Sequence, residues 1–453
     1  MRMKSFKWSE SMSTVPKRAK RENRTKADVL IVNANELVTL SGDPKPRVGK
    51  QMQELGIIRD GGLAVKDGRI VAVGKSAEVR NNVKAETVIS ADGKTVMPGF
   101  VDPHTHLVFA GSREDEFQMR VEGAYYLEIL AAGGGILKTV RETRKASVDR
   151  LVDSGMETLD AMLECGTTTV EAKSGYGLET RDELKILEVM KRLNQLHDVD
   201  VVPTFLGAHA FPPEFKGDPQ SYVNLVVEDM IPKAAEKGLA EFCDVFCEKG
   251  VFSLEQTRRV LLAGKGCGLK PKVHADEMTM FGGAELAADV GAVSADHLLF
   301  SSAEGLKAMA EKGVVAVLLP AAAFTLMNGR FADARRMIDL GVPVALGSDF
   351  NPSCWVLNMQ LILGFACHFM RLTPAEAVTA ATINAAHAVG RAGEVGSLEV
   401  SKKADVLILD VPNHKNLGYR FGANVVDKVI KNGRVVVDRE EKRGGIMFVE
   451  RAE

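Results

Sequence analysis

The sequence predicts an α/β protein, a (β/α)8 TIM-like barrel with a small β-sandwich domain built from both chain termini. Three observations predict this architecture. Eight β-rich segments alternate with amphipathic helical segments over the middle of the chain. Shorter β-rich segments, separated by Asp-Gly and Asn-Gly turns, occur at both ends. A chain of 453 residues is long enough for one large barrel with an accessory domain.

The accessory sandwich is predicted from two segments, 28–96 and 396–453. The first contains GGLAVKDGRIVAVG, with a turn at Asp67-Gly68, and the second contains VVDKVIKNGRVVVD, with a turn at Asn432-Gly433. Asp-Gly and Asn-Gly favour two-residue hairpins because these residues tolerate positive φ. The shared texture indicates one domain, with residues 97–395 inserted between its halves.

The inserted segment is predicted to form the eight barrel strands. They are expected at 97–106, 166–173, 198–209, 240–248, 269–276, 291–298, 313–321 and 341–349. One connecting helix is expected at 151–164, where apolar residues recur at helical spacing and Gly166 follows as a stop signal. Eight strands with helical crossovers are typical of a closed parallel barrel.

Composition excludes several classes of protein. Lys plus Arg is 58 and Asp plus Glu is 60, so the chain lacks the basic excess of a generic nucleic-acid or membrane-surface protein. No apolar run approaches the ~18 residues of a membrane span, and the N-terminus has no signal-peptide core. Six scattered cysteines indicate reduced thiols. We therefore expect a cytoplasmic protein with a small-molecule substrate and no nucleic-acid or membrane partner.

Two features allow more than one interpretation. Residues 1–27 form a predicted tail with a basic run at 16–21. A disordered arm or an upstream start-codon artefact is favoured over a targeting or polyanion-binding patch, because basic runs are weak signals. Cys243 and Cys247 are close enough to suggest a metal site. No second close cysteine pair accompanies them, so buried thiols are favoured.

Histidine and aspartate side chains occur where the predicted strands end. They are His104 and His106 on the first strand, His209 on the third, His274 on the fifth, His297 on the sixth and Asp349 on the eighth. In such a barrel these ends meet at one rim, where active sites are built. One histidine at a strand end is more often a core residue, but five at one rim indicate a site.

The strand-end residues also have the chemistry of a metal site. His104 and His106 are two residues apart, so both side chains point to one face of the strand. With His274 and Asp349 from other strands, they offer three nitrogens and one oxygen. We predict these four residues as ligands of one divalent or trivalent metal ion; Zn²⁺ fits best and Fe³⁺ is the alternative. Such a metal lowers the pKa of a bound water toward neutrality.

Longer strings resemble known families. PGFVDPHTH, KVHADE, SADH and LGSD resemble the metal-dependent amidohydrolase superfamily. TVEAKSGYGLE (169–179) and TFLGAHAFPPEF (204–215) narrow the resemblance to the imidazolonepropionase family, over essentially residues 28–440. The resemblance implies this barrel and sandwich and a homodimer. It also implies hydrolysis of 4-imidazolone-5-propanoate to N-formimidoyl-L-glutamate in histidine degradation, by metal-activated water attacking the ring carbonyl.

The implied reaction suggests a role for each kind of residue at the rim. Asp349 and Glu277 are both candidates for the base that takes the proton of the water. His297 suits stabilisation of the developing oxyanion. Arg113 can bind the propanoate in a bidentate manner. The alternative for Arg113 is a surface ion pair with a neighbouring glutamate, Glu114 or Glu116.

The resemblance also implies further substrate contacts. They are Tyr126, Tyr176, His209, Glu277, Asn351, Ser353 and Cys354. Ordinary packing is the alternative for each tyrosine. After Asn351-Pro352 the family usually has Gly-Thr, whereas Ser353-Cys354 stands here. Ser353 could still offer its backbone amide, but Cys354 replaces a hydroxyl donor with a weaker thiol donor.

Lys173, at the end of the second predicted strand, could be a carboxylated lysine that bridges two metals. In two-metal relatives that lysine lies on the fourth strand, and here the fourth strand ends Phe246-Cys247-Glu248 without one. We therefore predict one metal, with Lys173 as a structural ion-pair partner of a barrel carboxylate such as Glu171 or Glu248.

Two other functions are compatible with the scaffold. One is another cyclic amidohydrolase or a heterocycle deaminase, since metal and barrel do not choose the substrate. The other is a non-catalytic relative. Arg113 and Tyr176 disfavour the first, and a neutral purine needs no arginine in a carboxylate-binding position. The retained metal ligands disfavour the second.

Overall fold

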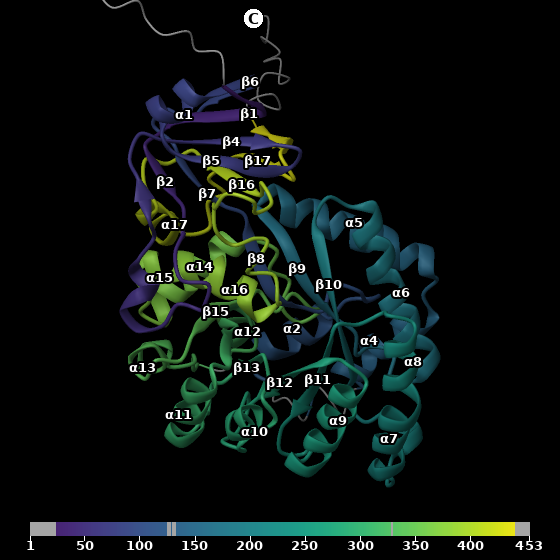
Figure 1. Cartoon of the computed structure of the whole chain (residues 1–453). Helices are drawn as coiled ribbons and strands as arrows, with labels where there is room; N and C mark the ends of the chain where they lie inside the picture. Colours follow the sequence, from purple (N-terminus) through teal and green to yellow (C-terminus); the bar gives the residue numbers. More distant parts are fainter. Residues whose placement is uncertain (1–23, 125–127, 129–132, 328, 440–453) are drawn as a thin grey trace, which may run out of the picture.

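The computed structural model describes residues 24–124, 128, 133–327 and 329–439. In the view of Figure 1 a small β-domain lies above a barrel that is surrounded by helices. The basic run at 16–21 and Tyr126 both lie outside the described residues.

The barrel consists of eight parallel strands that are hydrogen-bonded in chain order. They are β8 (Phe100–Thr105), β9 (Thr167–Lys173), β10 (Asp200–Ala208), β11 (Phe242–Cys247), β12 (Lys270–Ala275), β13 (Ser294–His297), β14 (Val315–Leu318) and β15 (Val344–Leu346). The ends of β15 and β8 meet where the His106 amide donates to the Phe350 carbonyl at 2.8 Å and the Asp349 amide donates to the His104 carbonyl at 3.0 Å. Each strand lies within its predicted range, so the predicted (β/α)8 barrel is confirmed.

The strand predicted at 97–106 is in fact two strands. β7 (Thr95–Pro98) belongs to the accessory domain and pairs with β16 (Val406–Leu409), and β8 starts the barrel only at Phe100. Gly99 joins them, and a Cβ at this position would lie 2.2 Å from Thr168 Oγ1. Only glycine fits so close an approach. The accessory domain therefore extends past the predicted limit at residue 96.

The accessory domain contains two sheets that share one apolar core. β5, β4, β1 and β6 form one sheet, and β18, β17, β16, β7, β2 and β3 form the other. The remaining strands are β1 (Thr25–Ala34), β2 (Glu36–Val38), β3 (Ile57–Ile58), β4 (Gly61–Lys66), β5 (Arg69–Lys75), β6 (Val83–Ser90), β17 (Val426–Lys431) and β18 (Arg434–Asp438). Ile31, Leu63, Ile408 and Ile430 are fully buried in this core. Strands from both ends of the chain share the second sheet, as predicted. β1 begins at Thr25, inside the range 1–27 that was predicted as a tail.

Helices surround the barrel (Figure 1). They are α2 (Glu114–Val121), α4 (Ile136–Lys145), α5 (Val148–Glu164), α6 (Thr180–Leu196), α7 (Pro219–Leu225), α8 (Ile231–Glu236), α9 (Leu254–Gly266), α10 (Gly283–Val290), α11 (Ala303–Lys312), α12 (Pro320–Thr325), α13 (Ala334–Asp339), α14 (Met359–Phe369), α15 (Pro374–Ala380) and α16 (Ile383–Ala388). Two further helices, α1 (Ser76–Asn82) and α17 (Lys415–Tyr419), lie toward the accessory domain in this view. The helix predicted at 151–164 is confirmed as α5. It begins three residues earlier because the Ser147 side chain caps it by accepting from the Arg150 amide.

The structure also bears on the membrane-spanning segment and the cysteine metal site that the sequence disfavours. Among the described residues, no helix is both long enough and apolar enough to cross a membrane. Cys243 and Cys247 are buried free thiols. Neither belongs to a group of potential metal ligands in the described part of the chain. The interpretation of this pair as core residues therefore agrees with the structure.

Candidate active site

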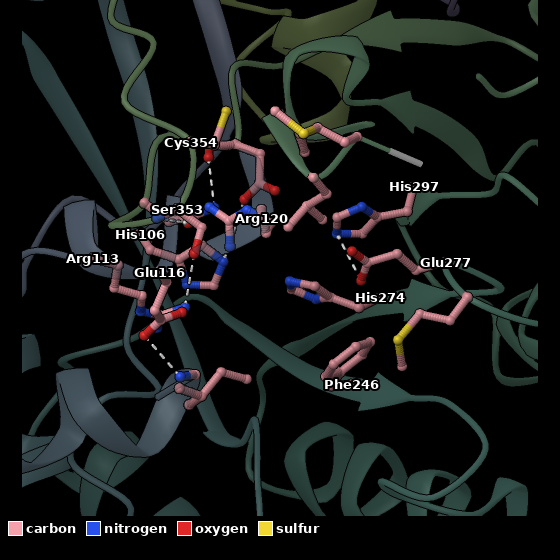
Figure 2. Close-up of a pocket in the computed structure, with 18 of the residues that line it drawn as sticks. His106, Arg113, Glu116, Arg120, Phe246, His274, Glu277, His297, Ser353 and Cys354 are labelled. Carbon is pink, nitrogen blue, oxygen red and sulfur yellow. Dashed lines mark hydrogen bonds and ion pairs between the residues drawn. The ribbon is translucent and has the colours of Figure 1, made fainter. Parts of the chain in front are cut away.

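A cavity of about 500 Å³ opens at the carboxyl ends of the barrel strands. His106, His274, His297 and Asp349 line it from the ends of β8, β12, β13 and β15. In the view of Figure 2, His274, Glu277 and His297 lie on one side, and Arg113, Glu116 and Ser353 on the other. The structure therefore brings together side chains that are more than 200 residues apart in the sequence.

The four predicted metal ligands lie close together and are buried. Asp349 Oδ1 is 3.5 Å from His104 Nε2 and 3.6 Å from His106 Nε2. The ligand atoms of His104, His106 and Asp349 all lie within 4.8 Å of one another. The same is true of a second group, His104, His274 and His297. The two groups share His104, so all five side chains surround one small space.

The unpaired nitrogens in this space fit a metal ion. His104 Nε2 and His274 Nε2 are buried and have no hydrogen-bonding partner among the described residues. Burial holds the pKa of His104, His106 and His274 well below the usual value, so these imidazoles are neutral. Neutral imidazoles with free lone pairs beside a carboxylate are the donor set of a divalent metal. These residues therefore form a candidate divalent metal centre.

Two residues of the site have left-handed backbone conformations. The φ angle is 73° at His297 and 51° at Asp349. A residue other than glycine rarely adopts this region, and such positions concentrate at functional sites. In both cases the left-handed residue lies where the barrel strand gives way to its loop.

The loop after β12 is held by two carboxylates, which position Glu277. Asp276 accepts hydrogen bonds from the amides of residues 281–284, at the start of α10. Glu248 accepts from the amides of Met278 and Thr279.

These contacts also bear on Lys173. Glu248 lies in the loop, so the prediction that it pairs with Lys173 is wrong. Lys173 contacts Glu171, as predicted, at 2.8 Å.

Arg113 is buried rather than paired on the surface with Glu114 or Glu116. Its Nε donates to Thr139 Oγ1 and its Nη1 donates to Ser353 Oγ, both at 2.9 Å. Its Nη2 has no hydrogen-bonding partner among the described residues. These contacts fix the plane of the guanidinium at the cavity wall and leave one edge free to bind an anion.

Tyr176 and His209 pack beside His106 on the same wall. The rings of His209 and His106 stack with centroids 5.0 Å apart, and Tyr176 lies 5.6 Å from His106. His209 Nδ1 is 3.0 Å from the Gly175 carbonyl. A carbonyl only accepts, so Nδ1 carries the proton and Nε2 is a free acceptor. Burial lowers the pKa of His209 to about 4.

Asn351, Ser353 and Cys354 form a tight turn at the edge of the cavity. The Ser353 amide donates to Asn351 Oδ1 at 2.8 Å, so the backbone donor considered for the substrate already has a partner. The hydroxyl of Ser353 is the group that meets Arg113. The Cys354 thiol is buried and donates to the Ser348 carbonyl at 3.5 Å.

Four charged residues in or behind the site were not predicted. Glu116 and Arg120 also line the cavity. With Arg113 they have the spacing of one helix face, at i, i+3 and i+7, which was the available signal. Asp244 and Asp296 lie fully buried behind the histidines. Their signal was a carboxylate inside an apolar strand, which requires a partner.

Comparisons with known proteins agree with this geometry. An amidohydrolase family model matches residues 266–436. Imidazolonepropionase of Alkaliphilus metalliredigens (strain QYMF) is 54% identical over 416 residues, which are 91% of this chain and 98% of that protein. Imidazolonepropionase of Geobacillus kaustophilus (strain HTA426) is 55% identical over 416 residues, covering 90% and 98%. The chain belongs to the imidazolonepropionase family. The resemblance seen in the sequence strings is therefore confirmed.

Solved structures with much lower sequence identity to this imidazolonepropionase family member share its fold. An adenosine deaminase from Xanthomonas campestris with bound zinc matches with a TM-score of 0.68 and 20% identity, covering 92% of this chain and 94% of that one. Guanine deaminase of E. coli matches with a TM-score of 0.69 and 15% identity, covering 90% and 99%. At these identities the likeness establishes the fold alone.

Proposed function

We propose that this chain hydrolyses 4-imidazolone-5-propanoate to N-formimidoyl-L-glutamate in histidine degradation. The observation that carries the proposal is the guanidinium of Arg113, which is buried and partly unpaired in the same cavity as the candidate metal ligands. Burying a cation without a partner is unfavourable. A neutral heterocycle gives no reason for such an arrangement, whereas a ring that carries a propanoate supplies the missing anion.

We assign His104, His106, His274 and Asp349 as the ligands of one metal ion, Zn²⁺ in preference to Fe³⁺. When bound, the ion acidifies a water and polarises the ring carbonyl. We leave His297 out of the ligand set because its Nε2 lies 3.7 Å from Glu277 Oε2. From that position His297 can stabilise the charge that develops on the carbonyl oxygen.

Two carboxyl groups can move the protons of the reaction. The water oxygen bonds to the ring carbonyl carbon, the ring C–N bond breaks, and a proton must reach the departing nitrogen. We assign Asp349 as the group that accepts the proton of the water. Burial, with a smaller contribution from Asp349, raises the pKa of Glu277 to about 8. We assign Glu277, in its protonated form, as the group that donates to the nitrogen.

We assign binding of the rest of the substrate to Arg113, which lies opposite Glu277 in Figure 2, and to His209 and Tyr176, which also line the cavity. Arg113 Nη2 binds the propanoate carboxylate. The free Nε2 of His209 accepts a hydrogen bond from a ring N–H. Burial raises the pKa of Tyr176, so its hydroxyl stays neutral and can donate to the substrate. The predicted homodimer and cytoplasmic location stay predictions.

The direct test is a steady-state assay with freshly generated 4-imidazolone-5-propanoate, following the loss of its ultraviolet absorbance. We expect rapid loss that prior chelation abolishes and added metal restores. The melting temperature of the chelated protein, measured in parallel, separates loss of metal from loss of fold. If the folded, metal-loaded protein leaves this substrate intact, the substrate is a different ring and the proposal is wrong.

Arg120 offers a second test of the anionic substrate. It lines the cavity without an ion pair among the described residues, and its Nε has no hydrogen-bonding partner. Burial and nearby Arg113 lower its pKa. We expect Arg120→Gln to raise KM about threefold to tenfold with little change in kcat, an effect limited by solvent screening. The effect should shrink in high salt. Arg181→Gln, at an exposed position outside the cavity, is the control and should leave KM unchanged.

A further inference from the structure

The ammonium group of Lys173 is buried inside the barrel at the end of β9. It lies 2.8 Å from Glu171 Oε1, 2.8 Å from Asp244 Oδ2 and 3.3 Å from Asp296 Oδ2. All four side chains are fully buried. One cation is thus surrounded by three carboxylates from three strands, in a place where unpaired charge is very unfavourable.

Two of these carboxylates continue to the candidate metal ligands. Asp296 Oδ2 is 2.6 Å from His104 Nδ1. Asp244 Oδ2 is 3.0 Å from His274 Nδ1. In each aspartate the oxygen that faces Lys173 also faces the histidine. The Lys173 ammonium group therefore contacts both aspartates that face His104 and His274, two predicted metal ligands that are far apart in the sequence.

The carboxylates bear on which nitrogen of each histidine faces the metal. Asp296 Oδ2 accepts a hydrogen bond from His104 Nδ1, so Nε2 of His104 keeps its lone pair. Asp244 Oδ2 faces His274 Nδ1 at ion-pair distance without hydrogen-bond geometry, and its charge favours a proton on that nitrogen. Both Nε2 atoms are buried without a hydrogen-bonding partner among the described residues. A metal ligand needs this tautomer and a fixed ring orientation, and outer carboxylates supply both.

We propose that Lys173 is a positioning residue for the metal centre. It holds Asp244 and Asp296 in place, and these hold His104 and His274 with Nε2 toward the metal. The same role explains why Lys173 is an ammonium rather than a carboxylated ligand, since a carbamate would add a fourth negative charge among three carboxylates. The inference rests on the metal site of the proposed function and is independent of the substrate.

Glu171 provides a matched control. Like the two aspartates, it contacts Lys173, but its other contacts are Thr204 and Lys272 rather than a histidine. Glu171→Gln, Asp244→Asn and Asp296→Asn each remove one negative charge from the same buried cluster. Only the two aspartate variants change a partner of a histidine. An asparagine that turns its amide nitrogen to Nδ1 also favours the wrong tautomer.

The experiment measures the affinity of each folded variant for Zn²⁺ by competition with a chromophoric chelator, without substrate. We expect Asp244→Asn and Asp296→Asn each to weaken binding about 10- to 100-fold. Glu171→Gln should change it by no more than about threefold. Equal losses in all three variants would mean that the cluster acts only through its charge, and the proposal would be wrong.

Lys173→Met tests the lysine itself. We expect this variant to weaken Zn²⁺ binding. The double variant Lys173→Met with Asp296→Asn should lose less free energy of Zn²⁺ binding than the sum of the two single losses, because both residues act on His104 through the same contacts. Full additivity would contradict the proposal. If Lys173→Met does not fold, the three carboxylate variants decide the question. Since no substrate is used, a wrong substrate assignment leaves the outcome unaffected.

Discussion

Asp349→Asn is expected to lower turnover about 10³-fold or more and to reduce the bound metal. The neutral amide loses the charge that faces His104 and His106 at 3.5 and 3.6 Å. It also cannot accept the proton of the water, a contribution that is typically worth 10²- to 10⁴-fold. The measurement is kcat with 4-imidazolone-5-propanoate, together with the metal content of the purified variant.

Glu277→Gln is the companion variant, because it removes the proposed proton donor without replacing any of the predicted metal ligands. We expect it to keep the metal and to lose less turnover than Asp349→Asn. Asp410→Asn, at an exposed position, controls for the substitution itself. If Asp349→Asn retains a substantial fraction of the wild-type turnover, Asp349 neither binds the metal nor handles the proton.

The barrel and its rim could be predicted because both depend on local patterns. Short apolar strands bounded by turn residues recur eight times, and their direction fixes which ends meet. Once the strands are assigned, the sequence therefore predicts that four side chains lie at the same rim: His104, His106, His274 and Asp349. The Asp67-Gly68 turn was also predicted from a local pattern. Its φ angles of 49° and 75° are positive, as a two-residue hairpin turn requires.

The partners behind the rim could not be predicted in the same way. Asp244 and Glu248 are four residues apart, so alternation along a strand assigns both to the same face. β11 ends at Cys247, which leaves Asp244 inside the barrel and carries Glu248 into the loop, where it accepts from Met278 and Thr279. Sequence alternation does not reveal where a strand stops to within one residue. The end of β11 decides which of these two carboxylates, Asp244 or Glu248, contacts Lys173.

Arg113 shows the same limit for long-range contacts. Its Nη1 donates to the hydroxyl of Ser353, which is 240 residues away in the sequence. Ser353 was identified as a departure from the usual Gly-Thr, and its expected contribution was a backbone amide. In the structure the Ser353 hydroxyl instead accepts a hydrogen bond from the guanidinium of Arg113. A residue that differs from the family pattern thus contacts the group proposed to bind the substrate.

Arg113→Ala is expected to raise KM about 30-fold or more, with a much smaller change in kcat. Truncating one partner of a buried charge pair costs about 2–5 kcal/mol, and each 1.4 kcal/mol is a factor of ten. The propanoate is distant from the ring carbonyl, so the loss falls on binding rather than on the chemical step. The measurements are KM, kcat and the affinity for 3-(imidazol-4-yl)propanoate and its amide. The acid should lose affinity and the amide should not.

The same variant also separates a binding role from a structural one. Removing a buried arginine usually destabilises a protein because a carboxylate loses its partner. Arg113 makes no ion pair among the described residues; its hydrogen-bonding partners there are the hydroxyls of Thr139 and Ser353, and its guanidinium also lies 6.0 Å from the centre of the Tyr176 ring. We therefore expect the melting temperature of Arg113→Ala to stay unchanged or to rise while KM increases, as is typical of residues kept for function. Ser353→Ala, which keeps the guanidinium, should raise KM far less. An unchanged KM in Arg113→Ala would remove the propanoate contact, and with it the observation on which the choice of substrate depends.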